Sequence, residues 1–192
     1  MVMLFPKKCA SCGRPGAAVC APCAERLVRA APTVPVAGLD SLVALFDWDD
    51  ASRVLVTAIK YRNAKAVAPW LSARLAAVAP GPVTRVSWIP TTPERRRRRG
   101  FDQAELLARA VARRLGVPST RLLTRDRGPA QTGAPAHVRR RGPRLRVSRP
   151  VRGAVLLVDD VCTTGTTLGR AGQALHAAGA DAVHGLTVAR VA

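Results

Sequence analysis

The segment from Val155 to Thr167, with the sequence Val-Leu-Leu-Val-Asp-Asp-Val-Cys-Thr-Thr-Gly-Thr-Thr, constrains the fold more than any other part of the chain. Its aliphatic run, Val155–Val158, is typical of a strand buried on both faces of a parallel sheet. Two acids, Asp159 and Asp160, follow this run, and a loop of small hydroxyl residues then opens a helix. Because ligands of open α/β sheets bind at the carboxyl ends of the strands, the segment predicts a ligand site.

The loop that follows the two acids suits a phosphate group. Its backbone N–H groups and hydroxyls, with the positive end of the helix dipole, favour an anion. The loop lacks the lysine of a P-loop and the glycine pattern of a dinucleotide site. Asp159 and Asp160 need a partner that is not an anion, and ribose hydroxyls meet that need. The segment therefore predicts a site for a ribose 5-phosphate group; the alternative is a strand with exposed acids and a well-capped helix.

The rest of the chain alternates between strands and helices. Apolar runs predict strands at residues 41–46, 83–90, 154–158 and 182–191. Periodic patterns predict helices that begin near residues 50, 66, 103 and 166, and the third has a capping box formed by Asp102 and Glu105. The first helix is expected to bury a face formed by Val54, Leu55, Ala58 and Ile59. This alternation predicts an α/β fold, a mostly parallel sheet flanked by helices, with a long loop over residues 124–150.

Four of the five cysteines form two Cys-x-x-Cys pairs near the N-terminus: Cys9, Cys12, Cys20 and Cys23. Each pair can turn both sulfur atoms toward one metal ion, so four thiolates predict a tetrahedral, structural Zn²⁺ site. A redox-active pair and a chance arrangement are the alternatives. The fifth cysteine, Cys162, is expected to be a small buried residue and not a ligand.

The chain is strongly basic. It holds 31 Lys and Arg residues against 12 Asp and Glu residues, which gives a formal net charge of +19. Residues 85–152 contain 19 Arg and 4 acidic residues, and 19 − 4 = 15 of the positive charges lie there. Such a surface attracts polyanions, either nucleic acid or a phosphorylated metabolite. A solvated basic face without a partner is the alternative.

The pattern of apolar and cysteine-rich stretches also indicates how the chain is organised. No run approaches the ~18 apolar residues that a membrane-spanning helix needs, so we expect no membrane insertion. The stretch 1–6 is too short for a signal-peptide core, and we expect a cytoplasmic protein. We place a zinc module and its linker in residues 1–38, and the α/β domain in residues 39–192.

These motifs together resemble a known family. The acids and hydroxyl residues of the segment 159–167 resemble the loop that binds phosphoribosyl pyrophosphate (PRPP) in type I phosphoribosyltransferases. The double Cys-x-x-Cys motif, the segment Arg99-Gly-Phe-Asp-Gln103 and the preceding Trp88-Ile-Pro90 resemble the ComF family of competence-associated bacterial proteins. The resemblance covers nearly the whole chain, and it implies a type I phosphoribosyltransferase fold with a small N-terminal zinc module of four cysteines.

The resemblance also implies roles for individual residues. Asp159 and Asp160 would be the catalytic acids and would bind the ribose hydroxyls of PRPP. PRPP, with Mg²⁺ on its pyrophosphate, would be bound by a further set: Val161, Thr163, Thr164, Gly165, Thr166, Thr167, Thr91, Thr92 and Arg99. Residues 125–141, including Gln131, would form a mobile loop that closes over the site. The chain departs from the family at Asp102, where Asn is usual, and at 60–62, which only partly match a Lys-Gly motif.

Two functions of different class follow from these features. The first is transfer of a phosphoribosyl group from PRPP to a nitrogen acceptor, in the setting of competence and DNA uptake. The second is handling of single-stranded DNA together with other DNA-uptake proteins, with a regulatory or vestigial PRPP site. No part of the sequence identifies the acceptor.

Overall fold

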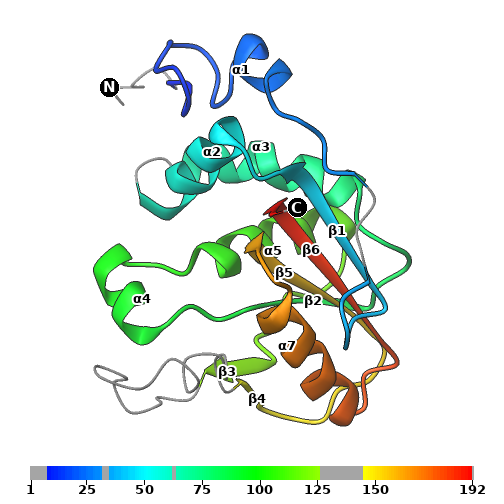
Figure 1. Cartoon of the computed structure of the whole chain (residues 1–192). Coiled ribbons are helices and arrows are strands. Elements are labelled where there is room, and N and C mark those ends of the chain that lie inside the picture. The colour runs from blue at the N-terminus through cyan, green and yellow to red at the C-terminus, as the bar shows by residue number, and fades with distance from the viewer. Residues whose placement is uncertain (1–7, 32–34, 62–63, 126–144, 192) are drawn as a thin grey trace.

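Four parallel strands form the central sheet, in the order β1-β6-β5-β2. Their bounds are Ser41–Asp47 for β1, Arg85–Trp88 for β2, Ala154–Cys162 for β5 and Ala182–Arg190 for β6. The computed structural model describes residues 8–31, 35–61, 64–125 and 145–191. The expected α/β fold with a parallel sheet is confirmed, and the strand that carries the two acids lies inside the sheet, between β6 and β2 (Figure 1).

Helices cover both faces of this sheet. On one face lie α2 (Asp50–Tyr61), α3 (Ala64–Ala77) and α5 (Gln103–Leu115), and on the other lies α7 (Thr166–Ala177). The side chains of β5 alternate accordingly: Leu156 and Val158 are buried with α3 and α5, whereas Val155 and Leu157 are buried with α7. Because successive side chains of a strand point to opposite faces, β5 contributes to the hydrophobic core on each side of the sheet.

Four shorter elements complete the fold. They are α1 (Ala21–Glu25), α4 (Pro93–Arg99) and an antiparallel pair, β3 (Leu123–Arg125) and β4 (Leu145–Val147). The short strand β3 overlaps the start of the expected loop 124–150, and β4 lies near its end, so the expectation of a loop is wrong in these two places. The expected mobile loop at 125–141 falls outside the described residues except for Arg125.

The start of α5 follows the capping signal, with one difference. Asp102 is the N-cap, and its Oδ1 accepts hydrogen bonds from the amides of Ala104 and Glu105 at 3.0 and 3.4 Å. The Glu105 carboxylate is engaged elsewhere, because it lies 2.8 Å from Nη2 of Arg109 and 3.5 Å from Nη1 of Arg96. Arginines of α4 and α5 thus compete for the glutamate that a reciprocal capping box would use.

Short segments outside the strands line both edges of the sheet. Along β1, the amide of Ala30 donates to the carbonyl of Leu45, and the amide of Asp47 donates to the carbonyl of Val28, each at 3.1 Å. Along β2, Val86 exchanges hydrogen bonds with the segment 118–120. The first contact anchors the chain just after the cysteine-rich segment, while the boundary at residue 38 remains a prediction.

The chain between the cysteine-rich segment and β1 crosses α7 at two glycines. A Cβ atom on Gly172 would overlap the carbonyl oxygen of Gly38, and one on Gly169 would overlap the carbonyl oxygen of Ala37. Only a helix without side chains at these positions lets the linker backbone approach so closely.

Within the described ranges, no helix has the length and apolar character needed to cross a bilayer.

Candidate functional site

Two adjacent acids lie near the carboxyl end of β5. Asp159 pairs in register with Thr187 of β6, and Asp160 is the next residue along the strand. Asp160 is buried, with 7% of its surface exposed, whereas Asp159 is partly exposed. Because successive side chains of a strand point to opposite faces, the two carboxylates approach the site from different layers of the molecule.

Asp160 is held by two side chains from the helical layer. Nζ of Lys60, in the last turn of α2, lies 2.8 Å from Oδ2 of Asp160. Nε2 of Gln103, the first residue of α5, donates to the same oxygen at 3.2 Å. One oxygen of the buried carboxylate therefore receives a cation and an amide donor.

The contacts continue outward from Gln103 to the arginine-rich helix α4. Nη1 of Arg99 donates to Oε1 of Gln103 at 2.8 Å, and its Nη2 donates to the Tyr61 hydroxyl at 3.3 Å. The guanidinium carbon of Arg99 also lies 4.9 Å from the centre of the Tyr61 ring. Hydrogen bonds and charge from Arg99 lower the pKa of Tyr61. Arg99, expected to bind ligand directly, is thus already engaged with Gln103 and Tyr61.

The protonation of Asp159 is displaced by its surroundings. Burial, followed by the charge of Asp160, raises the pKa of the Asp159 carboxyl well above its ordinary value. The amide of Asp160, which donates to Oδ1 of Asp159 at 2.8 Å, and the charge of Lys60 act in the opposite direction. Two close carboxylates cannot both ionise freely unless cations compensate them, and Lys60 is one such cation.

A second cation, Arg125 at the end of β3, interacts electrostatically with Asp159. Burial lowers the pKa of the Arg125 guanidinium, and the nearby charge of Asp159 opposes that effect. Nε of Arg125 is buried and has no hydrogen-bond partner among the described residues. A buried guanidinium nitrogen without a partner is uncommon, so the polar group of Arg125 is left unsatisfied by the described part of the fold.

The hydroxyl-rich loop leads from β5 into α7. Gly165 is the N-cap of α7 with a φ of 71°, and the threonines 163, 164 and 166 are exposed. Oγ1 of Thr164 lies 2.9 Å from Oγ1 of Thr166, and the amide of Gly169 donates to the carbonyl of Gly165 to begin the helix. This places exposed hydroxyls around the N-terminus of a 12-residue helix that follows closely on the strand carrying the acids.

The other residues expected to bind PRPP have internal roles in this structure. The amide of Thr91 donates to Oδ2 of Asp102 at 2.8 Å, and the Thr92 hydroxyl caps α4 by accepting from the amide of Arg95 at 3.3 Å. Val161 is paired with Ala189 of β6 and packs against the helical core. Their part in binding PRPP remains a prediction.

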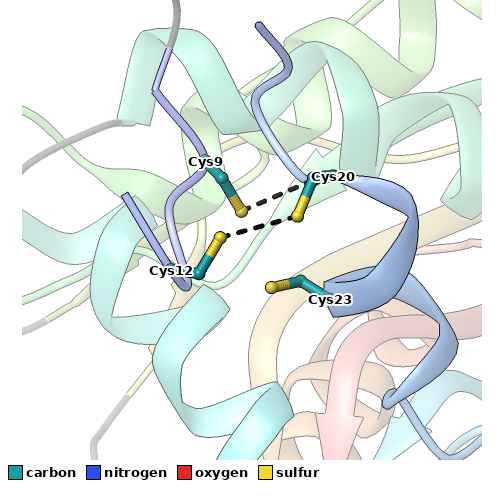
Figure 2. Close-up of side chains that lie close together, drawn as sticks. All are labelled: Cys9, Cys12, Cys20 and Cys23. Carbon is teal, nitrogen blue, oxygen red and sulfur yellow. Dashed lines mark hydrogen bonds between the residues drawn. The ribbon is translucent and has the colours of Figure 1, made fainter. Parts of the chain in front are cut away.

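The four N-terminal cysteines form a separate cluster, shown in Figure 2. Their sulfur atoms all lie within 4.8 Å of one another, and those of Cys12 and Cys20 are 3.6 Å apart. Burial disfavours the Cys9 thiolate, but hydrogen bonds from the amides of Cys12, Cys20 and Ser11 together lower its pKa to about 6. Four convergent sulfurs fit the tetrahedral set of four thiolates that a structural Zn²⁺ ion requires.

The sequence pattern brought the two acids and the threonine loop to one place, but it assigned no site role to Lys60, Gln103 or Tyr61. It included Arg125 only as the first residue of the expected mobile loop. The sequence did contain a motif at two of these positions, Gln103 and Lys60. Gln103 closes the family-like segment 99–103, and Lys60 opens the partial Lys-Gly match. The sequence does not indicate that these two residues contact Asp160, because Lys60 and Gln103 lie on different helices and meet at Asp160 only in the folded chain.

Comparisons with known proteins find relatives of this chain. The phosphoribosyl transferase domain family matches residues 102–192, which include both acids and the threonine loop. The chain is 31% identical over 189 residues to DNA utilization protein YhgH of Salmonella typhi and 30% identical to that of Escherichia coli strain K12. Each alignment covers 91% of this chain and 80% of the relative.

A solved structure shows a similar fold. Glutamine phosphoribosylpyrophosphate amidotransferase from B. subtilis, complexed with ADP and GMP, aligns with a TM-score of 0.50 and 22% identity. The alignment covers 68% of this chain but only 30% of that enzyme, so the chain spans less than a third of its length. With the cysteine cluster and the relatives above, these similarities establish that the chain belongs to the ComF family, whose members carry a phosphoribosyltransferase-type domain.

Proposed function

We propose that the protein binds PRPP and transfers its phosphoribosyl group to a nitrogen nucleophile. One observation carries the proposal: two adjacent acids at the carboxyl end of a central parallel strand are followed directly by exposed hydroxyls at a helix N-terminus. Asp159 and Asp160 accept the two ribose hydroxyls, and the loop 163–167 binds the 5-phosphate. The family match over residues 102–192 supports this assignment.

The reaction breaks the bond between C1 of the ribose and the pyrophosphate oxygen, and forms a bond from C1 to nitrogen. Positive charge develops on the sugar and negative charge on the leaving group. Mg²⁺, when bound, neutralises part of the negative charge of the pyrophosphate. On this proposal the pyrophosphate oxygens would hold the ion. Arg125 and the arginines of α4 supply further fixed positive charge.

Replacing both acids by asparagine should weaken PRPP binding at least tenfold. Each charge-assisted hydrogen bond to a ribose hydroxyl is worth roughly 1.5–3 kcal/mol, and one tenfold step in affinity corresponds to about 1.4 kcal/mol. The substitutions also remove negative charge near a polyanion, which favours binding. We expect the loss of hydrogen bonds to dominate, because the diol lies on the carboxylates while the phosphates lie on the loop and on cations.

Calorimetric titration with PRPP and Mg²⁺ compares the wild type, the Asp159→Asn/Asp160→Asn variant and Asp50→Asn. Asp50 is an exposed acid in the first turn of α2, so its substitution controls for a change in overall charge. If the wild type neither binds nor is stabilised at millimolar PRPP, the proposed function is wrong.

We also propose that the cysteine cluster binds one structural Zn²⁺ ion. The donor set supports this assignment: four sulfurs converge from two Cys-x-x-Cys turns, and the described residues of the segment 8–27 contribute few apolar side chains to the core. Zinc would tie down a segment that burial alone stabilises weakly.

Binding of single-stranded DNA is a second candidate function, and helix α4 favours it. Arginines 95–98 are exposed on this helix, and the relatives are named DNA utilization proteins. Replacing these four residues by serine should flatten the dependence of log K on log salt concentration by up to about 3, because each lost contact with a single strand removes about 0.7.

The matched control for this experiment removes four exposed arginines elsewhere: Arg26, Arg53, Arg113 and Arg152. Equal slopes for the two quadruple variants would show that α4 makes no specific contact with the phosphates. No binding by the wild type at low salt would exclude this function.

A further inference from the structure

We propose that Lys60 is a positioning residue of the PRPP site, which holds one oxygen of Asp160 so that the other oxygen accepts a ribose hydroxyl. The inference rests on the proposed function and adds to it a residue from α2, which lies outside the segment matched by the phosphoribosyl transferase domain family. It follows from the contacts of Asp160, from the charges around the acid pair and from a closed set of contacts between four elements.

The two donors that hold Asp160 both contact the same oxygen. Nζ of Lys60 lies 2.8 Å from Oδ2, and Nε2 of Gln103 lies 3.2 Å from it. No residue in the described part of the chain donates to Oδ1, and this atom is not among the buried polar atoms without a partner. The carboxylate is therefore held through one oxygen, and no described donor occupies the other.

The position of Lys60 also answers an electrostatic need. Asp159 and Asp160 are neighbours, and a ligand with a phosphate and a pyrophosphate would bring further negative charge to them. The side chains of Lys60 and Asp160 are only 25% and 10% exposed, so solvent screens this ion pair much less than a surface pair. The Lys60 ammonium places a compensating positive charge next to Asp160 on the helical side, and the charge of Arg125, at the end of β3, interacts with Asp159.

Lys60 and its neighbour Tyr61 close a ring of contacts. Lys60 contacts Asp160, Asp160 accepts from Gln103, Gln103 accepts from Arg99, and Arg99 donates to Tyr61. The ring joins α2, β5, α5 and α4, and its first and last members are consecutive in the chain. The last turn of α2 is thus fixed to the acid at two points, which limits the directions in which Nζ can move.

A merely structural ion pair would share this geometry, so the experiment separates the two roles. PRPP affinity is measured by calorimetry for the wild type, Lys60→Met, Lys60→Arg and Arg53→Met. Arg53 is an exposed cation on the same helix, so Arg53→Met removes the same charge without touching the acids. We expect Lys60→Met to weaken PRPP binding about tenfold, Lys60→Arg to recover it to within about threefold, and Arg53→Met to leave it unchanged.

A double-mutant cycle with Asp160→Asn tests whether Lys60 acts through Asp160. If it does, Lys60→Met/Asp160→Asn binds PRPP no more weakly than Asp160→Asn alone. Should Lys60→Met fail to fold, Lys60→Ala takes its place in every comparison, with Arg53→Ala as its control, because it also removes the donor to Asp160.

The inference is overturned if Lys60→Met binds PRPP as tightly as Arg53→Met, or if the two losses multiply in the double variant. In either case wild-type binding would still support the proposed function. Absence of PRPP binding by the wild type would overturn both.

Discussion

Replacing Cys9 and Cys12 by serine will remove the metal and unfold the segment 8–27. Structural zinc contributes roughly 10–16 kcal/mol to the folding of small zinc modules at neutral pH, because the unfolded segment has no preformed site. The buried apolar residues of this segment are few: Cys9, Val19 and Leu27. Metal analysis should fall from about one zinc per chain to none, and limited proteolysis should cut within the segment.

Cys162→Ser is the matched control for this experiment, since Cys162 is buried at the end of β5 and is not part of the cysteine cluster. It should retain the full zinc content. A Cys9→Ser/Cys12→Ser variant that keeps one equivalent of zinc would show that the ion is bound elsewhere or that two cysteines suffice.

Gly172→Ala will destabilise the fold although it introduces the best helix former. In an open helix this substitution adds about 1 kcal/mol of stability. Here the new Cβ would overlap the carbonyl oxygen of Gly38 and lie 2.8 Å from Cδ2 of Leu39. Overpacking of this kind costs about 1–3 kcal/mol, and we expect the upper end because a backbone atom must move. Urea unfolding measures the change.

Ala177→Ser, at an exposed position on the same helix, provides the reference and should change the free energy of unfolding by less than about 0.5 kcal/mol. If Gly172→Ala proved as stable as the wild type, the linker 36–39 would not lie against α7 in solution as it does in this structure.

Most of the sheet could be predicted because its strands are apolar runs. The four strands and the four longer helices carry periodic patterns, and burial on both faces of β5 matches the uninterrupted run Val155–Val158. Helix α4 shows no such pattern, since its sequence is Pro-Glu followed by five arginines. Its signals are local ones instead: the Thr92 cap and Gly100, which ends the helix in the left-handed conformation.

Packing between helices and strands explains why the buried face of α2 differs from the one expected from the sequence. Val54 was expected on the buried face of α2 but is 38% exposed, while Val56 is buried at 1%. The two valines differ by two positions, so they lie on different faces of the helix, and the contact with α3 and β6 selects the face. Asp102 has the role that the sequence predicts and a further contact that it does not predict. It caps α5 as predicted, and its Oδ2 also holds the amide of Thr91, a contact that only the folded chain shows.

The acids and the threonine loop were predictable because they are contiguous in sequence, whereas the residues that orient them were not. Lys60 lies 100 positions before Asp160 and Gln103 lies 57 positions before it. No local pattern indicates such a pairing, since a lysine near the end of a helix is equally typical of a solvated position.

The segments that cover the two outer strands of the sheet, β1 and β2, affect how readily the protein would aggregate. A bare edge strand presents unpaired N–H and C=O groups that can recruit another chain. Here residues 28–30 line part of β1, and residues 118–120 line part of β2. The cover on β1 follows directly after the cysteine cluster, whereas the cover on β2 follows the end of α5. We therefore expect that unfolding of the cysteine segment uncovers β1 before β2, and that self-association of such chains begins at β1.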